Sequence, residues 1–178
     1  MKGVMKSFVT ISALSALAIA PIFMSAGSAS AAPKKGTDAS YVGVGVAAGV
    51  TNGGQSGDAA TFGGNIVGRA KLGNSPLSAR GQINFSDQTS AIIPHLTVDV
   101  PIAKGTNVYV GGGYQFVEKD GKPTPSGNKD GVAVVAGVES EVARNFLIYS
   151  NATVGINAYK NSPASGVSIN SGIGYRFR

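Results

Sequence analysis

Residues 77–86 read LSARGQINFS, and small or apolar side chains alternate with polar ones at every position. Leu77 and Phe85 fall on one side of this alternation, whereas Arg80 and Asn84 fall on the other. A period of two predicts a β-strand with one apolar and one polar face. The same pattern recurs in segments of about ten residues to the end of the chain, and charged residues repeatedly occupy the polar face. This pattern is typical of an outer-membrane β-barrel, which is apolar outside and polar inside.

Eight such segments predict an all-β fold, an eight-stranded antiparallel up-and-down transmembrane β-barrel over residues 41–178. Pro94 lies inside the fourth segment, and because proline cannot donate to a sheet ladder we expect a β-bulge there. The alternative is a secreted soluble barrel, in which the apolar face would point inward. The predicted strands cover residues 41–50, 62–72, 77–86, 92–102, 107–116, 131–140, 146–156 and 167–177.

The predicted connections fall into two sets. Tight turns are expected at 73–76, 103–106 and 141–145. Longer connections, rich in turn residues, follow at 51–61, 118–130 and about 157–166, and a shorter one lies at 86–91. Short turns at the periplasmic rim and longer loops outside are the usual asymmetry of these barrels.

The N-terminal residues predict a cleaved secretory signal peptide over residues 1–31. Lys2 and Lys6 precede an apolar run from 8 to 20, and small residues ending in Ala29-Ser-Ala31 follow. An N-terminal membrane anchor is the alternative, but the run is short for a spanning helix. Residues 32–40 are then a short leader before the barrel.

Aromatic residues provide an independent test of the barrel. Phenylalanines and tyrosines on the outward face should form two girdles at the two levels of the lipid headgroups. Four are expected at the external ends of their strands and three at the periplasmic ends. The external set is Phe62, Phe85, Tyr114 and Phe116, and the periplasmic set is Phe146, Tyr175 and Phe177.

The C-terminal strand resembles that of the small porin-like family of eight-stranded outer-membrane barrels, which includes the opacity proteins and the outer membrane protein A and X barrels. In that family the last strand ends in an aromatic residue preceded by alternating apolar residues, and Phe177, Tyr175 and Ile173 fit. Two departures are Arg178 at the end and Ser171 within the apolar series. The resemblance implies an outer-membrane protein that serves as an adhesin, structural anchor, defence protein or minor pore.

Charged residues on the inward face are the candidates for a specific role. Both signs are present, so we expect ion pairs across the lumen, because unpaired charges in a narrow interior are costly. The cluster would either fill and stabilise the barrel or act as a gate. Lumen glycines such as Gly43, Gly45, Gly111 and Gly113 would leave room for a water-filled cavity above it. The predicted lumen charge network comprises Arg69, Lys71, Arg80, His95, Asp99, Glu139 and Arg176.

The sequence contains no motif for catalysis, metal or cofactor binding. Cysteine is absent and His95 is the only histidine, without an identifiable serine partner for a triad. The charged residues are dispersed along the chain, which argues against nucleic-acid binding. We expect contact with outer-membrane lipid and lipopolysaccharide, a monomer, and a possible extracellular ligand at loops 51–61 and 118–130. The leading function is structural or a surface interaction; a narrow or gated pore for small solutes is the alternative.

Overall fold

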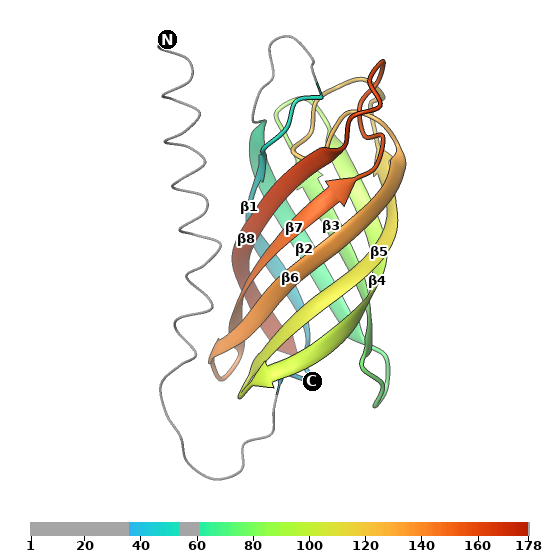
Figure 1. Ribbon diagram of the computed structural model, residues 1–178. Helices are drawn as coiled ribbons and strands as arrows, with labels where there is room; N and C mark the ends of the chain where they lie inside the picture. Colours follow the sequence, from blue (N-terminus) through green and yellow to red (C-terminus); the bar gives the residue numbers. More distant parts are fainter. Residues whose placement is uncertain (1–35, 54–60, 178) are drawn as a thin grey trace, which may run out of the picture.

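The computed structural model describes residues 36–53 and 61–177, which form one closed barrel of eight antiparallel strands (Figure 1). The predicted signal peptide at 1–31, residues 32–35 of the leader, residues 54–60 of loop 51–61 and Arg178 lie outside the described residues. The strands are β1 (Ser40–Gly49), β2 (Phe62–Lys71), β3 (Leu77–Phe85), β4 (Ser90–Ala103), β5 (Thr106–Val117), β6 (Gly131–Ala143), β7 (Phe146–Gly155) and β8 (Gly166–Phe177).

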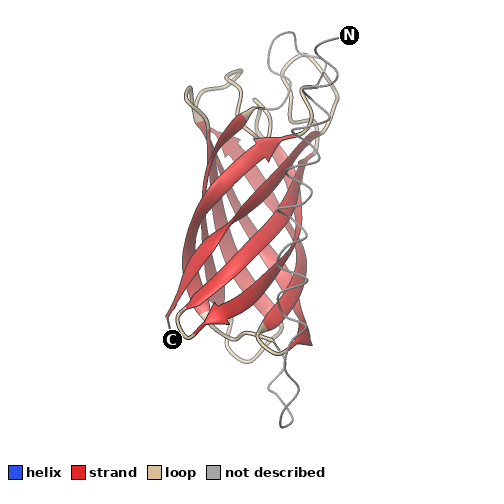
Figure 2. Ribbon diagram, turned by 90° about the vertical axis from the view of Figure 1, so that its left-hand side faces the viewer, coloured by secondary structure: helices blue, strands red, loops and turns tan. Residues whose placement is uncertain are grey.

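Each strand pairs with the next along the chain, and β8 pairs with β1 to close the sheet. The strands run obliquely around the barrel axis (Figures 1 and 2), as closure of an eight-stranded sheet requires. The tight turns lie at the lower end in Figure 1, together with the C-terminus, and the longer loops lie at the upper end. Among the described residues, no helix is long and apolar enough to cross a membrane.

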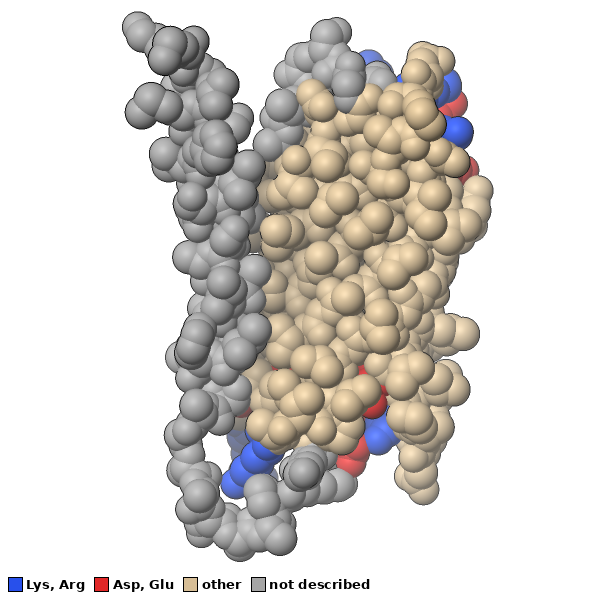
Figure 3. Space-filling view, viewed as in Figure 1, with Lys and Arg blue, Asp and Glu red and all other residues tan. Residues whose placement is uncertain are grey.

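The apolar face of the barrel points outward. Leu96 on β4, Val110 on β5 and Ile173 on β8 each leave more than half of their surface uncovered by protein. In the space-filling view, acidic and basic side chains gather at the two ends, and a broad band between them carries none on the visible described surface (Figure 3). The inward side chains include buried Arg, Asp, Glu, Asn and Gln residues. This arrangement excludes the soluble barrel with an apolar interior.

The bulge expected at Pro94 is not present. Pro94 pairs with Gly81 in the unbroken β3–β4 register, and the β4–β5 register is the same on either side of it. Within β4, Ile93 and Pro94 have no paired residue on β5. The proline therefore interrupts hydrogen bonding without adding a residue. The register instead shifts between Pro101 and Ala103, beside the tight β4–β5 turn.

The aromatic residues lie where the two girdles were predicted. All seven side chains are exposed on the outer face at strand ends, between 40% and 62% uncovered. Tyr114 and Phe116 lie with ring centroids 4.9 Å apart at the loop end, and Phe146 and Tyr175 form an edge-to-face pair at 5.6 Å at the turn end. Two separated aromatic levels bracket the apolar band as the headgroup regions of a bilayer would.

Candidate functional site: the barrel lumen

Four buried charged side chains from four strands meet in the turn-side half of the lumen. We call this group, Arg69, Arg80, Asp99 and Glu139, the lumen cluster. Each arginine contacts both carboxylates: Arg69 lies 2.7 Å from Asp99 and 2.8 Å from Glu139, and Arg80 lies 3.0 Å from each. Positive and negative groups therefore alternate in a closed ring with no net charge. This pairing satisfies charges that would be costly if buried alone.

Neutral side chains form further contacts with the charged residues of the lumen cluster. Arg69 Nε donates to Ser78, which donates to Asp99, and Arg80 Nε donates to Thr97. The guanidinium carbon of Arg80 also lies 3.7 Å from the centroid of the Tyr109 ring, a cation–π distance. Two further partners are Tyr41, whose hydroxyl accepts from Arg80, and Asn107, whose amide donates to Glu139. Side chains from several strands thus hold the lumen cluster in place.

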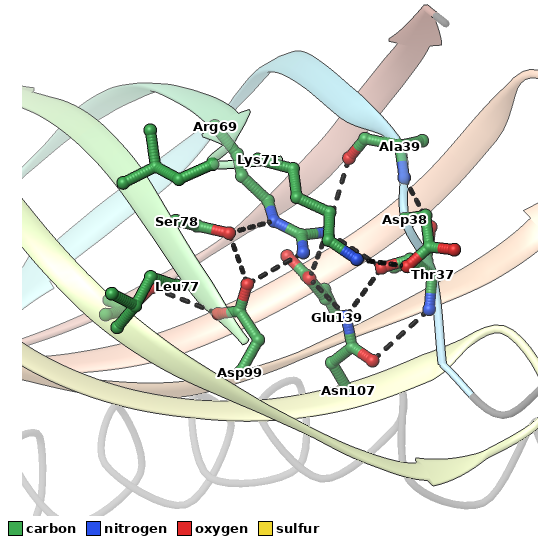
Figure 4. Close-up of polar contacts among 12 residues, drawn as sticks. Thr37, Asp38, Ala39, Arg69, Lys71, Leu77, Ser78, Asp99, Asn107 and Glu139 are labelled. Carbon is green, nitrogen blue, oxygen red and sulfur yellow. Dashed lines mark hydrogen bonds and ion pairs between the residues drawn. The ribbon is translucent and has the colours of Figure 1, made fainter. Parts of the chain in front are cut away.

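The segment just before β1 closes the turn end beneath the lumen cluster. Figure 4 shows Thr37 and Ala39 beside Arg69, Glu139 and Asn107. Arg69 Nη1 donates to the carbonyls of Thr37 and Ala39, and Asn107 donates to the Thr37 carbonyl while accepting from its N–H. Gly36, at a φ of 80°, pairs with Lys104 in the β4–β5 turn. A small cavity of about 230 Å³ remains at this mouth.

Three residues of the predicted network lie outside the lumen cluster. Lys71 forms an ion pair with Asp38 at the rim, and Arg176 pairs with Glu141 at 2.5 Å, also at the rim. The strands end at these positions, so both side chains extend toward the mouth of the barrel. His95 is buried in the lumen, where its Nδ1 lies 2.9 Å from the Ile93 carbonyl of its own strand, and it forms no ion pair with an acidic residue in the part of the chain that the structure describes.

The four lumen glycines are positions where other parts of the barrel approach the backbone closely. A Cβ on Gly43 would lie 2.7 Å from the ring of Tyr149, and one on Gly111 or Gly113 would meet the backbone of β4 at 2.0 Å or less. Gly45 likewise approaches the backbone of β8. These glycines allow a tyrosine ring or a neighbouring strand to approach closely. At Gly43 the close neighbour is a side chain inside the lumen, whereas at the other three glycines it is the backbone of the adjacent strand in the barrel wall.

The β5–β6 loop, residues 118–130, does not lie wholly outside the barrel as expected. Its tip, residues 124–128, is buried in the mouth between the other loops. The Ser126 hydroxyl accepts from Asn84 and lies 3.3 Å from that of Ser168, both inward-facing strand residues. The tip can enter because glycines surround it: a Cβ on Gly166 would lie 2.3 Å from the Ser126 carbonyl oxygen. The charged residues flanking the tip remain exposed.

Sequence reasoning missed two contributors to the lumen cluster. Thr37 lies within the predicted leader, although its backbone carbonyl accepts a hydrogen bond from Arg69. Tyr41 begins β1 with inward parity, and it lies fully buried against Arg80 and Tyr149. Parity could have identified Tyr41, because Val42 beside it faces outward. No pattern in the sequence identifies Thr37, because it lies outside any strand.

Comparison with known proteins finds similarity in structure only. No protein-family model matches the sequence, and no curated protein matches it. The structure is similar to Ail, the attachment invasion locus protein of Yersinia pestis, with a TM-score of 0.52 and 19% identity over 78% of this chain and 98% of that one. Neisserial surface protein A gives a TM-score of 0.53 and 15% identity over 78% and 97% of the two chains.

A de novo designed transmembrane β-barrel is also similar, with a TM-score of 0.52 and 13% identity over 80% of this chain and 99% of the design. Similarity to a designed sequence indicates that the shared feature is the architecture. The comparisons agree with the closed barrel of antiparallel strands seen in this chain. The fold is therefore that of the small eight-stranded transmembrane β-barrels of the outer membrane.

Proposed function

We propose that the protein is a non-enzymatic outer-membrane barrel that acts through its external end, in a structural or surface-contact role, and does not conduct solutes. The observation that carries this proposal is the filling of the lumen at two levels. The lumen cluster crosses the turn-side half, and the tip of the β5–β6 loop occupies the opposite mouth. Eight strands leave an interior just wide enough for such side chains.

The external end offers an ordered, charged surface. The Asn128 N–H donates to the carbonyl of Ala158, and the Lys160 N–H donates to the Asn128 side chain, which ties the β5–β6 loop to the β7–β8 loop. Around this junction lie exposed charged side chains of both signs. Loops held by a rigid barrel are common carriers of binding function. The exposed lysines of the two loops are Lys119, Lys122, Lys129 and Lys160.

Outer-membrane lipopolysaccharide, whose phosphates and sugars surround this end, is the partner that fits both the location and the lysines. The test uses the protein in nanodiscs with and without lipopolysaccharide, followed by amide chemical shifts. We expect shifts around Lys122 and Lys129 and none at the Asn74–Ser75 turn at the opposite end. Unchanged loop signals in lipopolysaccharide-containing discs would contradict the contact.

A narrow or gated pore is the second candidate, favoured by the polar lining of the lumen. Conductance of the refolded protein in planar bilayers separates the two. We expect no channel steps from the parent, and none from Arg80→Ala or Glu139→Ala, because the loop tip still closes the other mouth. Steps in the parent would establish a pore, and steps only in the variants would make the lumen cluster a gate.

The buried position of His95 supports a non-enzymatic role. A lipid-modifying triad would need to lie within reach of an acyl chain on the outer face. His95 instead faces the lumen and contacts a backbone carbonyl. Incubation with lipid A followed by mass analysis tests this directly: intact lipid A is expected, and released acyl chains would overturn the proposal.

A further inference from the structure

Two inward side chains of the barrel recognise the backbone of the segment just before β1, residues 36–39. The Asn107 amide donates to the Thr37 carbonyl at 2.9 Å, and its Oδ1 accepts from the Thr37 N–H at 3.2 Å. Arg69 donates to the carbonyls of Thr37 and Ala39, each at 3.2 Å. These contacts involve main-chain groups, so any peptide of the right conformation could make them.

The side chains of the segment alternate between buried and exposed. Thr37 and Ala39 are only 3% and 5% exposed, whereas Asp38 between them is exposed and pairs with Lys71 at the rim (Figure 4). Main-chain hydrogen bonds that give affinity, with places for alternate side chains that give specificity, are the features by which proteins recognise an extended peptide. The turn-side mouth has both features.

The first position of the segment accepts only glycine. Gly36 has a φ of 80°, and its N–H donates to the Ala103 carbonyl at 2.8 Å. A Cβ at this position would lie 2.3 Å from Asn107 Oδ1 and 2.7 Å from Pro101 Cβ. The mouth therefore discriminates among peptides by side chain as well as by backbone.

Open space borders the segment. One cavity of about 530 Å³ lies beside Lys104 and Arg176, and another of about 230 Å³ lies beside Asn74 and Pro76. Asp38 lines both cavities. Because the segment is bordered by cavities, it can leave the mouth without repacking of the strands.

We propose that the turn-side mouth is a binding site for an extended peptide, and that residues 36–39 occupy it in cis. The peptide it takes has glycine first, small residues second and fourth, and an acidic residue third that reaches Lys71. A tethered ligand has a high effective concentration, so the site opens to a peptide in trans only when the segment is released. The inference is separate from the proposed surface role, because the mouth lies at the opposite end of the barrel.

The test is NMR of the refolded protein in phosphatidylcholine nanodiscs. In the parent we expect the Thr37 N–H to be protected from hydrogen exchange. Gly36→Ala places a Cβ too close to Asn107 and Pro101, so we expect that protection to be lost. Gly112→Ala is the matched control, since a Cβ there lies no closer than 3.5 Å to its nearest neighbour, and it should leave the protection unchanged.

The released site is then offered the peptide acetyl-GTDA-amide, which copies residues 36–39 without terminal charges. We expect the side-chain amide signals of Asn107 in Gly36→Ala to shift toward their positions in the parent, and the parent itself to show no change. The same peptide with proline in place of Thr37 lacks the N–H that Asn107 Oδ1 accepts, so it should cause no shift.

Three results would overturn the proposal. A Thr37 N–H that exchanges in the parent as in a free peptide would mean that the segment is not bound. No shift on adding the peptide to a released site would mean that the mouth holds only the tethered chain. Equal shifts from the proline peptide would mean that the backbone is not recognised. If Gly36→Ala fails to fold, as judged by heat-modifiable migration, or keeps the protection, Thr37→Pro replaces it, because it removes the same N–H from the chain itself.

Discussion

Arg69 on β2 and Glu139 on β6 stand on opposite walls of the barrel, and 2.8 Å separates their charged atoms. Neither side chain exposes more than 1% of its surface. The ion pair therefore spans the full width of the lumen at one level. With Arg80 and Asp99 it forms a ring in which each charge has two partners of opposite sign.

Replacement of Glu139 with glutamine should destabilise the barrel strongly. Two buried guanidinium groups would then share the single carboxylate of Asp99, and an uncompensated buried charge costs about 3–5 kcal/mol. We expect a loss of that order in the free energy of unfolding, measured by urea denaturation in lipid vesicles. The matched control is Glu141→Gln at the rim, where the partly exposed pair with Arg176 should contribute no more than about 1 kcal/mol. Equal effects would contradict a special role for the buried ring.

Substitution of Gly166 with alanine should displace the loop tip from the mouth. The added Cβ would lie 2.3 Å from the Ser126 carbonyl oxygen, which is backbone and cannot rotate away. We expect faster trypsin cleavage at the neighbouring Lys129 and faster amide exchange over 124–128. Gly81→Ala is the matched control, since a Cβ there meets nothing within 4 Å. Unchanged cleavage in Gly166→Ala would show that the tip is not held in the mouth.

The cost of placing a charged side chain on the outer face should depend on its depth in the bilayer. Leu96 and Ile102 both lie on β4 with about half of their surface uncovered, Leu96 within the apolar band and Ile102 near the turn end. Leu96→Arg should cost about 2–4 kcal/mol and Ile102→Arg about 0–1 kcal/mol, as for lipid-facing positions at the midplane and interface. Unfolding in vesicles measures both. Equal small costs would mean that this face meets water.

The phenol of Tyr159, in the β7–β8 loop, should ionise at a higher pH than a free tyrosine. Burial raises the pKa of Tyr159 above its ordinary value, and the hydrogen bond to Thr51 opposes this in part. Because the folded pKa is raised, the stabilisation by the protonated phenol is complete below pH about 10 and is lost as pH rises through the folded pKa. Ultraviolet difference titration against Tyr159→Phe measures this. A Tyr159 signal titrating as free tyrosine does would contradict the burial of the loop.

Strand periodicity predicted most of the fold. The third strand, predicted over 77–86, spans Leu77–Phe85 and has the parity that its alternation indicated. The same logic assigned the inward face of Arg80 and the outward face of Phe85. This works because side chains in a strand have a period of two, so one register fixes every position. The alternation is therefore enough to assign a barrel wall from sequence.

The contents of the lumen were harder to predict, for physical reasons. Parity places Arg69 and Lys71 on one face, but it carries no information on how far each lies from the mouth or what stands opposite. The shear of the closed sheet decides that Arg69 meets Glu139 while Lys71 meets Asp38. The inward path of residues 124–128 depends on glycines of other strands, which no local pattern reveals.

The most direct test of the central claim uses the absence of native cysteine. Thr97 and Val98 are adjacent residues of β4 that face opposite sides of the sheet. Each is replaced by cysteine in a separate variant, and a nitroxide label is attached before the protein is studied in lipid vesicles. Electron paramagnetic resonance then measures collision with oxygen, which partitions into acyl chains. We predict high oxygen accessibility at Val98 and low accessibility at Thr97. High accessibility at Thr97 with a water-exposed label at Val98 would contradict the account.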